Sequence, residues 1–145
     1  MNTRFPSKVA VISVGMDLSG SDWGHDLTNG PEHILKNGGL EKFLRSKFRG
    51  RFEKYSIDAT PAALQRPGQE IAHLDDIVRV SKEVQTLSQR LWNEGAFVIV
   101  LGGEQTVDLG FVAGAATSDV GDGQQRILSV TSFDGHLDCN TLETS

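Results

Sequence analysis

The feature that most constrains the fold is a six-residue apolar run, Ala96-Phe97-Val98-Ile99-Val100-Leu101, bounded by glycines. A run of this length without a polar residue is typical of a strand buried on both faces, as in a parallel sheet. A second run, Val9-Ala10-Val11-Ile12-Ser13-Val14, has nearly the same character. We therefore expect these two runs to be strands of one parallel sheet.

The segments between the strands have helical periodicity. Residues 70–93 carry apolar residues at three- and four-residue spacing, with Asp75 and Asp76 near the start and Arg90 near the end, as the helix dipole favours. The expected order is a strand at 9–14, helices opening at Gly30 and Leu40, a weaker strand at 52–57, a helix at 70–93, a strand at 96–101, a helix at 104–116 and a strand at 126–132. This alternation predicts an α/β fold in which helices cover both faces of a parallel sheet.

The composition fits one globular domain. The chain has 145 residues, of which 38% are hydrophobic and 23% charged, so there is enough apolar material for one core. The formal net charge of −5 argues against a general affinity for nucleic acid. The basic run 42–51 could form a nucleic-acid patch, but a solvated helix face that ends in a turn at Gly50 is the simpler interpretation.

The cysteine content and the N-terminus bear on the compartment. The single cysteine, Cys139, excludes an internal disulfide framework and fits a reducing compartment. The polar N-terminus lacks the apolar core of a signal peptide, and no stretch approaches the roughly 20 apolar residues that span a bilayer. We therefore expect a cytoplasmic protein that has no membrane partner.

The segment that follows residues 126–132 has the composition of a metal site. Asp134, His136 and Asp138 alternate with small or apolar residues. On an extended backbone, residues two apart point to the same side, so these three side chains could converge. Two carboxylates and an imidazole suit a divalent ion such as manganese or zinc. The alternative is a structural loop in which Asp134 or Asp138 caps the backbone.

A second candidate region is the turn Gly102-Gly103-Glu104-Gln105, which follows the strand at 96–101. In open parallel sheets, ligands bind beyond the carboxyl ends of the strands, where the loop after Val14, this turn and the Asp134 segment would all lie. The glycine pair allows a close backbone approach or a tight turn, and by itself does not distinguish a site from a turn. Gln105 could equally cap the following helix.

These two stretches resemble motifs of the arginases, in the ureohydrolase superfamily. That family has one strand ending in Gly-Gly-Asp-His-Ser and another ending in Asp-Ala-His-Thr-Asp-Ile-Asn-Thr; the corresponding stretches here are residues 102–106 and 134–141. Gly30-Pro31 and Gly39-Leu40 are similar to the family's first helix. The resemblance runs from about Val9 to Thr141 and is to the N-terminal half of the family, so residues 1–145 are expected to be a single partial arginase-like domain.

The resemblance implies a truncated three-layer α-β-α fold with a mainly parallel sheet and a site for two manganese ions. The implied reaction is hydrolysis of the guanidinium group of L-arginine to L-ornithine and urea. Asp134 would bridge both metals, His136 would bind one metal and Asp138 the other. Asn140 matches the asparagine that contacts the substrate α-carboxylate. No separate catalytic residue is carried over.

Two departures from the family pattern limit the implied activity. Gln105 stands where the family has a metal-binding histidine, and an amide oxygen is a poorer donor to a transition ion. Glu104 could substitute as a carboxylate ligand, although it matches a family aspartate that does not bind metal. The family's remaining metal aspartates come from a later segment that these residues lack, so we expect the chain as given to be inactive.

Three hypotheses follow for function. The first is an arginase-type enzyme, of which this chain is a truncated form. The second is a non-catalytic arginase-like protein whose degraded metal site leaves it a binding or regulatory partner, as a homo- or hetero-oligomer. The third is an unrelated doubly wound domain that holds an anion at its glycine turn.

Overall fold

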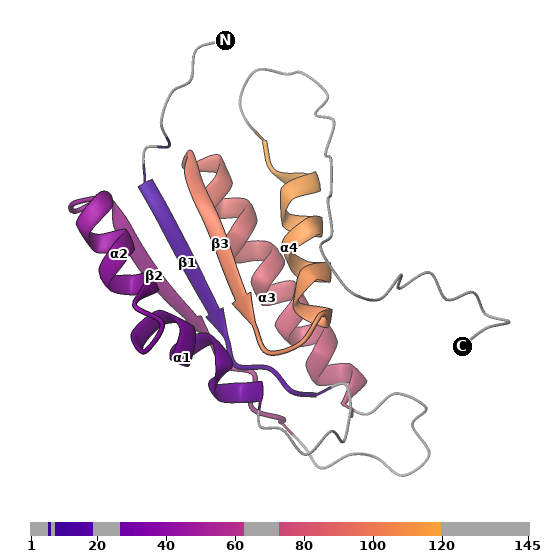
Figure 1. The fold of residues 1–145 in the computed structure, drawn as a ribbon. Coiled ribbons are helices and arrows are strands. Elements are labelled where there is room, and N and C mark those ends of the chain that lie inside the picture. The colour runs from indigo at the N-terminus through magenta and orange to yellow at the C-terminus, as the bar shows by residue number, and fades with distance from the viewer. Residues whose placement is uncertain (1–5, 7, 19–26, 63–72, 120–145) are drawn as a thin grey trace, which may run out of the picture.

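Three parallel strands form the centre of the computed structural model, which describes residues 6, 8–18, 27–62 and 73–119 (Figure 1). They are β1 (Lys8–Val14), β2 (Phe52–Ile57) and β3 (Ala96–Gly102), in the spatial order β2-β1-β3. In the register of the sheet, Val14 of β1 lies opposite Ile57 and Gly102. The three carboxyl ends therefore meet at one edge, as the sequence predicted.

Helices cover both faces of this sheet, which confirms the three-layer α/β prediction. A short 3₁₀ turn (η1, Leu27–Asn29) leads into α1 (Gly30–Lys36), and α1 and α2 (Leu40–Lys47) lie on one face. The longer α3 (Leu74–Asn93) and α4 (Thr106–Thr117) lie on the other face. Pro31 in the first turn of α1 and Glu32 beside it start that helix as expected.

Strand β1 is apolar almost throughout because both of its faces are covered. Ala10, Ile12 and Val14 pack in the cluster formed with α3 and α4. Val9 and Val11 point the other way, into the cluster formed with α1 and α2. All five side chains are at most 1% exposed. The alternation of side chains along a strand thus places one apolar run in two separate cores.

Two helix boundaries differ from the sequence prediction. The helix expected at 70–93 begins at Leu74, because His73 has a φ of 53°, which a continuous right-handed helix does not allow. The helix expected at 104–116 begins at Thr106, after a turn. Both end near the predicted residues, with Gly95 at a φ of 74° after α3. The strand expected at 126–132 lies outside the described residues.

The basic run 42–51 lies on α2 and the turn after it. The Arg45 guanidinium pairs with Glu41 at 2.8 Å and lies 4.8 Å from the centroid of the Phe52 ring. The Lys47 ammonium lies 5.9 Å from the centroid of the Phe43 ring. These local contacts support the interpretation as a solvated helix face. None of the helices described here is long and apolar enough to cross a membrane.

Candidate functional site at the carboxyl edge of the sheet

The loop after β1 and the turn after β3 are in backbone contact. A Cβ atom on Gly103 would overlap the carbonyl oxygen of Met16 and would lie 2.7 Å from that of Leu27. Only glycine fits between these carbonyl groups without displacing the chain. The close approach that the glycine pair allowed is therefore present, and the partner is this protein's own backbone.

Glu104 ties the same two segments together through its side chain. Its carboxylate accepts a hydrogen bond from the backbone N–H of Leu18 at 3.0 Å and another from the Thr106 hydroxyl at 2.5 Å. The first bond reaches across from the turn after β3 to the loop after β1. In this arrangement the carboxylate has a structural function, which gives no support to the hypothesis that Glu104 replaces a metal ligand.

Gln105 is exposed at the carboxyl end of β3, immediately before α4. It has the N-cap position of that helix, but its side chain makes no capping hydrogen bond. The alternative that Gln105 caps the helix is therefore wrong. The turn itself lies at the carboxyl end of β3, where the sequence placed it.

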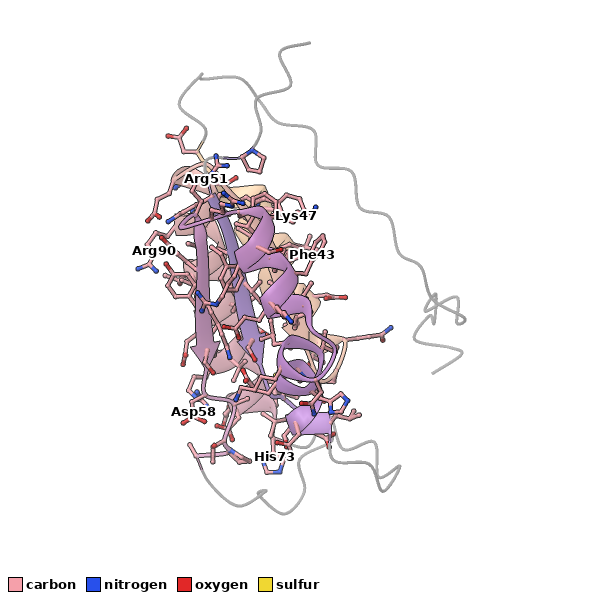
Figure 2. All side chains as sticks on the ribbon, turned by 60° about the vertical axis from the view of Figure 1, so that its left-hand side comes forward. Phe43, Lys47, Arg51, Asp58, His73 and Arg90 are labelled. Atoms are coloured by element: carbon pink, nitrogen blue, oxygen red, sulfur yellow. The ribbon has the colours of Figure 1, made fainter. Side chains whose placement is uncertain are left out.

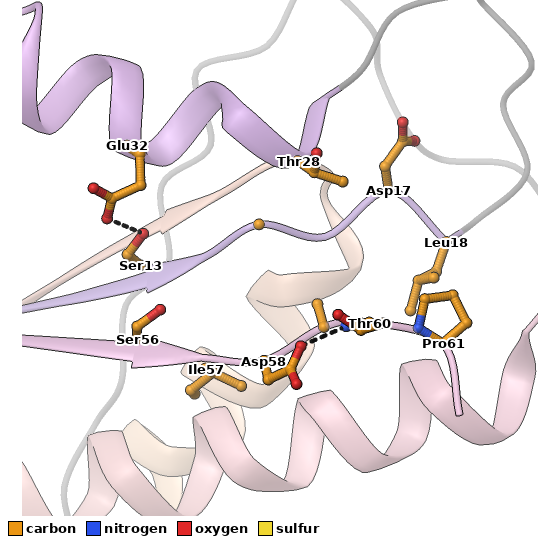
Figure 3. Close-up of a pocket in the computed structure, with 12 residues that line it drawn as sticks. Ser13, Asp17, Leu18, Thr28, Glu32, Ser56, Ile57, Asp58, Thr60 and Pro61 are labelled. Atoms are coloured by element: carbon orange, nitrogen blue, oxygen red, sulfur yellow. Dashed lines mark hydrogen bonds between the residues drawn. The ribbon is translucent and has the colours of Figure 1, made fainter. Parts of the chain in front are cut away.

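A cavity of about 580 Å³ opens between the carboxyl ends of β1 and β2 (Figure 3). It is lined by residues of the strand ends and of the segments that follow them: Ser13, Gly15, Asp17, Leu18, Thr28, Glu32, Ser56, Ile57, Asp58, Ala59, Thr60 and Pro61. Three of these residues are acidic. The sequence placed the loop after Val14 at this edge but did not predict a cavity between the two strand ends, although the polar residues that directly follow both strands were a usable signal.

Ion pairs and hydrogen bonds hold the acidic groups of this cavity. The Glu32 carboxylate lies 2.7 Å from the Lys54 ammonium and 3.2 Å from that of Lys36, and accepts a hydrogen bond from the Ser13 hydroxyl at 3.3 Å. The hydrogen bond from Lys54 lowers the pKa of Glu32 against the opposing effect of burial, and Lys36 lowers it further. Glu32 is therefore ionised at neutral pH and tied to the lysines.

The chain after β2 is fixed by local hydrogen bonds. The Asp58 carboxylate accepts the Thr60 backbone N–H at 2.9 Å, and hydrogen bonds from the Thr60 side chain and backbone lower the Asp58 pKa. The Arg79 guanidinium of α3 donates to the carbonyl oxygens of Asp58 and Thr60, both at 3.0 Å. The wall of the cavity is thus attached to α3.

The predicted metal ligands Asp134, His136 and Asp138, and the predicted substrate contact Asn140, lie outside the described residues. Within the part of the chain that the structure describes, no three Asp, Glu, His or Cys side chains are placed to hold a metal ion. Two carboxylates and an imidazole fit manganese by their chemistry. At this edge, the described residues provide the Gln105 amide and the contacts of Gly103 and Glu104 that fix the turn before it.

Comparison with known sequences identifies the same family that the motifs resemble. The family model described as "Arginase family" matches residues 7–145. The arginase of Brevibacillus brevis is 26% identical over 137 residues, which cover 94% of this chain and 43% of the relative. The Neurospora crassa arginase is 24% identical over 143 residues, covering 97% of this chain and 39% of the relative. The chain thus spans less than half of the length of these relatives.

Solved structures support the fold. The Entamoeba histolytica arginase in complex with L-ornithine superposes with a TM-score of 0.65 at 21% identity, covering 80% of this chain and 38% of that chain. The Bacillus caldovelox arginase gives a TM-score of 0.61 at 23% identity, covering 76% and 36%. At these identities the solved structures establish only the fold. Membership of the family rests on the family model, which matches residues 7–145. The chain therefore belongs to the arginase family.

Proposed function

We propose that this chain carries part of an arginase-type centre that hydrolyses the guanidinium group of L-arginine to L-ornithine and urea. The observation that carries the proposal is the match to the arginase family across residues 7–145, with both glycine-turn and Asp-x-His-x-Asp stretches in family order. The L-ornithine in the Entamoeba histolytica structure is a ligand of that relative and supports the same substrate class.

In this proposal, Asp134, His136 and Asp138 hold manganese, and Asn140 contacts the α-carboxylate of the substrate. Manganese, when bound, supplies a water that is acidic enough to give hydroxide near neutral pH. The described residues form the carboxyl edge of the sheet, where these groups would act. Gly103 and Glu104 fix the turn that presents Gln105, the position of a family metal-binding histidine.

The isolated 145-residue chain should release no measurable urea from L-arginine in the presence of added manganese. The physical reason is an incomplete donor set: an amide stands at Gln105, and three of six family ligand positions have a match in this chain. A urea assay on the purified protein, with Brevibacillus brevis arginase as the positive control, tests this expectation. Manganese-dependent turnover that a chelator abolishes would contradict it.

Replacing Gln105 with histidine should raise manganese affinity roughly tenfold or more, because imidazole is the better donor. Isothermal titration with manganese measures the change. The control is the double variant Gln105→His/Asp134→Ala, in which the gain should disappear. An unchanged affinity in Gln105→His would mean that Gln105 and the Asp134 segment do not form one site.

The second candidate function is a non-catalytic one, as a binding or regulatory partner. The observation that favours it is Gln105, since loss of a metal-binding histidine weakens a metal centre before it disturbs the fold. The metal content of the purified protein separates the two functions. Manganese that copurifies with the protein would support the arginase-type function. Protein purified without manganese would support the non-catalytic function.

A further inference from the structure

The basic run 42–51, on α2 and the turn after it, concentrates positive charge on one surface. It contains five Lys or Arg residues and no Asp or Glu, in a chain whose net charge is −5. All five of these side chains are exposed. A positive surface on a protein that is acidic as a whole favours contact with an anionic partner.

Most cations of this run lack the carboxylate partners that other cations of the chain have. Outside the run, the described lysines and arginines that pair with a carboxylate are Lys8, Lys36, Lys54, Arg79 and Arg90. Within the run, Arg45 pairs with Glu41. The other four have no carboxylate partner among the described residues: Lys42, Lys47, Arg49 and Arg51. These four cations are available to carboxylates of another molecule.

An exposed aromatic ring lies among these cations. Phe43 is 54% exposed, and the Lys47 ammonium lies 5.9 Å from the centroid of its ring. The two residues are four apart on a helix and therefore share one side of it. Figure 2 shows both on α2, with Arg51 beyond the end of that helix. An apolar group flanked by charges is the usual composition of an interface anchor and its rim.

The geometry of α2 favours a polypeptide over a membrane or a nucleic acid. A helix that lies in a membrane surface inserts its apolar side, but Leu44 on that side of α2 is 4% exposed and packs in the core beneath the helix. With eight residues, α2 is about 12 Å long. A nucleic acid would extend beyond it, and its further phosphates would meet a protein of net negative charge.

We propose that this basic face, formed by Phe43 with Lys42, Lys47, Arg49 and Arg51, binds an acidic segment of another polypeptide. The segment carries several Asp or Glu residues and one apolar side chain. Charge complementarity carries this choice, because carboxylates would neutralise cations that have no such partner among the described residues. Guanidinium groups bind carboxylates through paired hydrogen bonds, and the apolar side chain packs on the phenyl ring.

The basic face is remote from the candidate site. Figure 2 shows Lys47 and Arg51 toward one end of the sheet and Asp58 toward the other. Strand β2 begins at Phe52, directly after the run, and ends at Ile57 beside the cavity. A segment bound to α2 therefore leaves the carboxyl edge free. The proposal is independent of urea release, so its failure and failure of the proposed activity are distinguishable.

The test is titration of the full 145-residue chain into a fluorescein-labelled peptide that has four glutamates on each side of a central leucine, followed by fluorescence anisotropy. We expect saturable binding at about 50 mM salt and roughly tenfold weaker binding at about 300 mM salt, since salt screens exposed charges. A peptide with glutamine in place of glutamate should bind at least roughly tenfold more weakly.

A charge reversal locates the contact. Lys47→Glu should weaken peptide binding roughly tenfold, because it replaces an attraction by a repulsion. Lys82→Glu is the matched control: it makes the same change of charge at an exposed lysine of α3, which lies on the opposite face of the sheet. It should leave the affinity within about twofold. Circular dichroism of each variant verifies that the fold is retained.

A double-mutant cycle tests the apolar part of the contact. Replacing the central leucine of the peptide with glycine should weaken binding to the parent protein roughly fivefold. The same replacement should have little effect on binding to Phe43→Ser, because the ring on which the leucine packs is then absent. Equal losses with the two proteins would contradict the assignment of Phe43 to the contact.

Three further results would overturn the proposal. One is the absence of saturable peptide binding at about 50 mM salt. Another is an equal loss of affinity in Lys82→Glu and Lys47→Glu, which would mean that the peptide responds to total charge and not to the basic face. The third is tighter binding of a single-stranded RNA or of phosphatidylserine vesicles than of the peptide, which would make phosphate groups the ligand.

Discussion

The carboxyl edge of the sheet is closed on one side of β1 and open on the other. Between β1 and β3, the backbone of Gly103 lies directly against the carbonyl groups of Met16 and Leu27, and Glu104 bonds to the neighbouring loop. Between β1 and β2, a cavity of about 580 Å³ separates the strand ends, and acidic side chains line it (Figure 3).

The difference shows how one edge combines a rigid part with an accessible part. On the closed side, contacts are between main-chain atoms, which tolerate no added side chain. On the open side, the Glu32 carboxylate lies 2.7 Å from the Lys54 ammonium, and the hydrogen bond from Lys54 lowers the pKa of Glu32. Substitutions should therefore have steric consequences on the closed side and pH-dependent consequences on the open side.

The largest effect is expected for Gly103→Ala, which tests the closed side. The added methyl group overlaps backbone oxygen, so the free energy of unfolding should fall by about 3 kcal/mol. Urea denaturation followed by circular dichroism measures it. Gly30→Ala is the matched control, because a Cβ added there would meet no atom within 4 Å, and it should change stability by less than about 1 kcal/mol. Equal effects of the two substitutions would mean that the close contact of Gly103 with the Met16 and Leu27 carbonyl groups does not restrict this position.

A smaller effect is expected for Glu104→Ala. It leaves the Leu18 N–H and the Thr106 hydroxyl without this acceptor, so the free energy of unfolding should fall by about 1–2 kcal/mol. Glu104→Gln keeps one acceptor oxygen and should lose about half as much. Glu41→Ala, which removes a surface pair with Arg45, should cost less than about 0.5 kcal/mol. If Glu104→Ala matched that surface value, the bond between the two segments would have no energetic weight.

The smallest effect belongs to the open side and depends on pH. The folded-state pKa of Glu32 lies below its ordinary value of 4.5, mainly because of the hydrogen bond from Lys54. A lowered folded pKa stabilises the protein above pH 4.5, and this stabilisation is lost as the pH falls through the folded pKa. Urea unfolding at pH 7, 5, 4 and 3 should show a shallower acid decline in Glu32→Gln and Lys54→Met than in the parent. The same decline in all three proteins would exclude this pair as a source of acid sensitivity.

The sequence predicted the layers of the fold well and their junctions poorly. The apolar runs that became β1 and β3 were identified because strands buried on both faces need continuous apolar residues. The start of α3 was placed four residues early, because the periodicity of residues 70–93 contains no sign that His73 adopts a left-handed conformation. Similarly, the Glu104 bond to Leu18 joins residues 86 apart in the sequence, and no local pattern encodes it.

For the candidate site, the sequence determined which residues could bind metal and substrate. The structure determined the contacts of the turn after β3, which lies at the same edge of the sheet. Asp134, His136, Asp138 and Asn140 are predictions from motif and spacing, and they stay so because they lie outside the described residues. That Gly103 must be glycine, that Glu104 is held in a structural bond and that β3 lies at one edge of the three described strands came only from the tertiary structure. The reason is physical: spacing along a chain fixes which side chains share a face, whereas contacts between distant segments depend on how the layers pack.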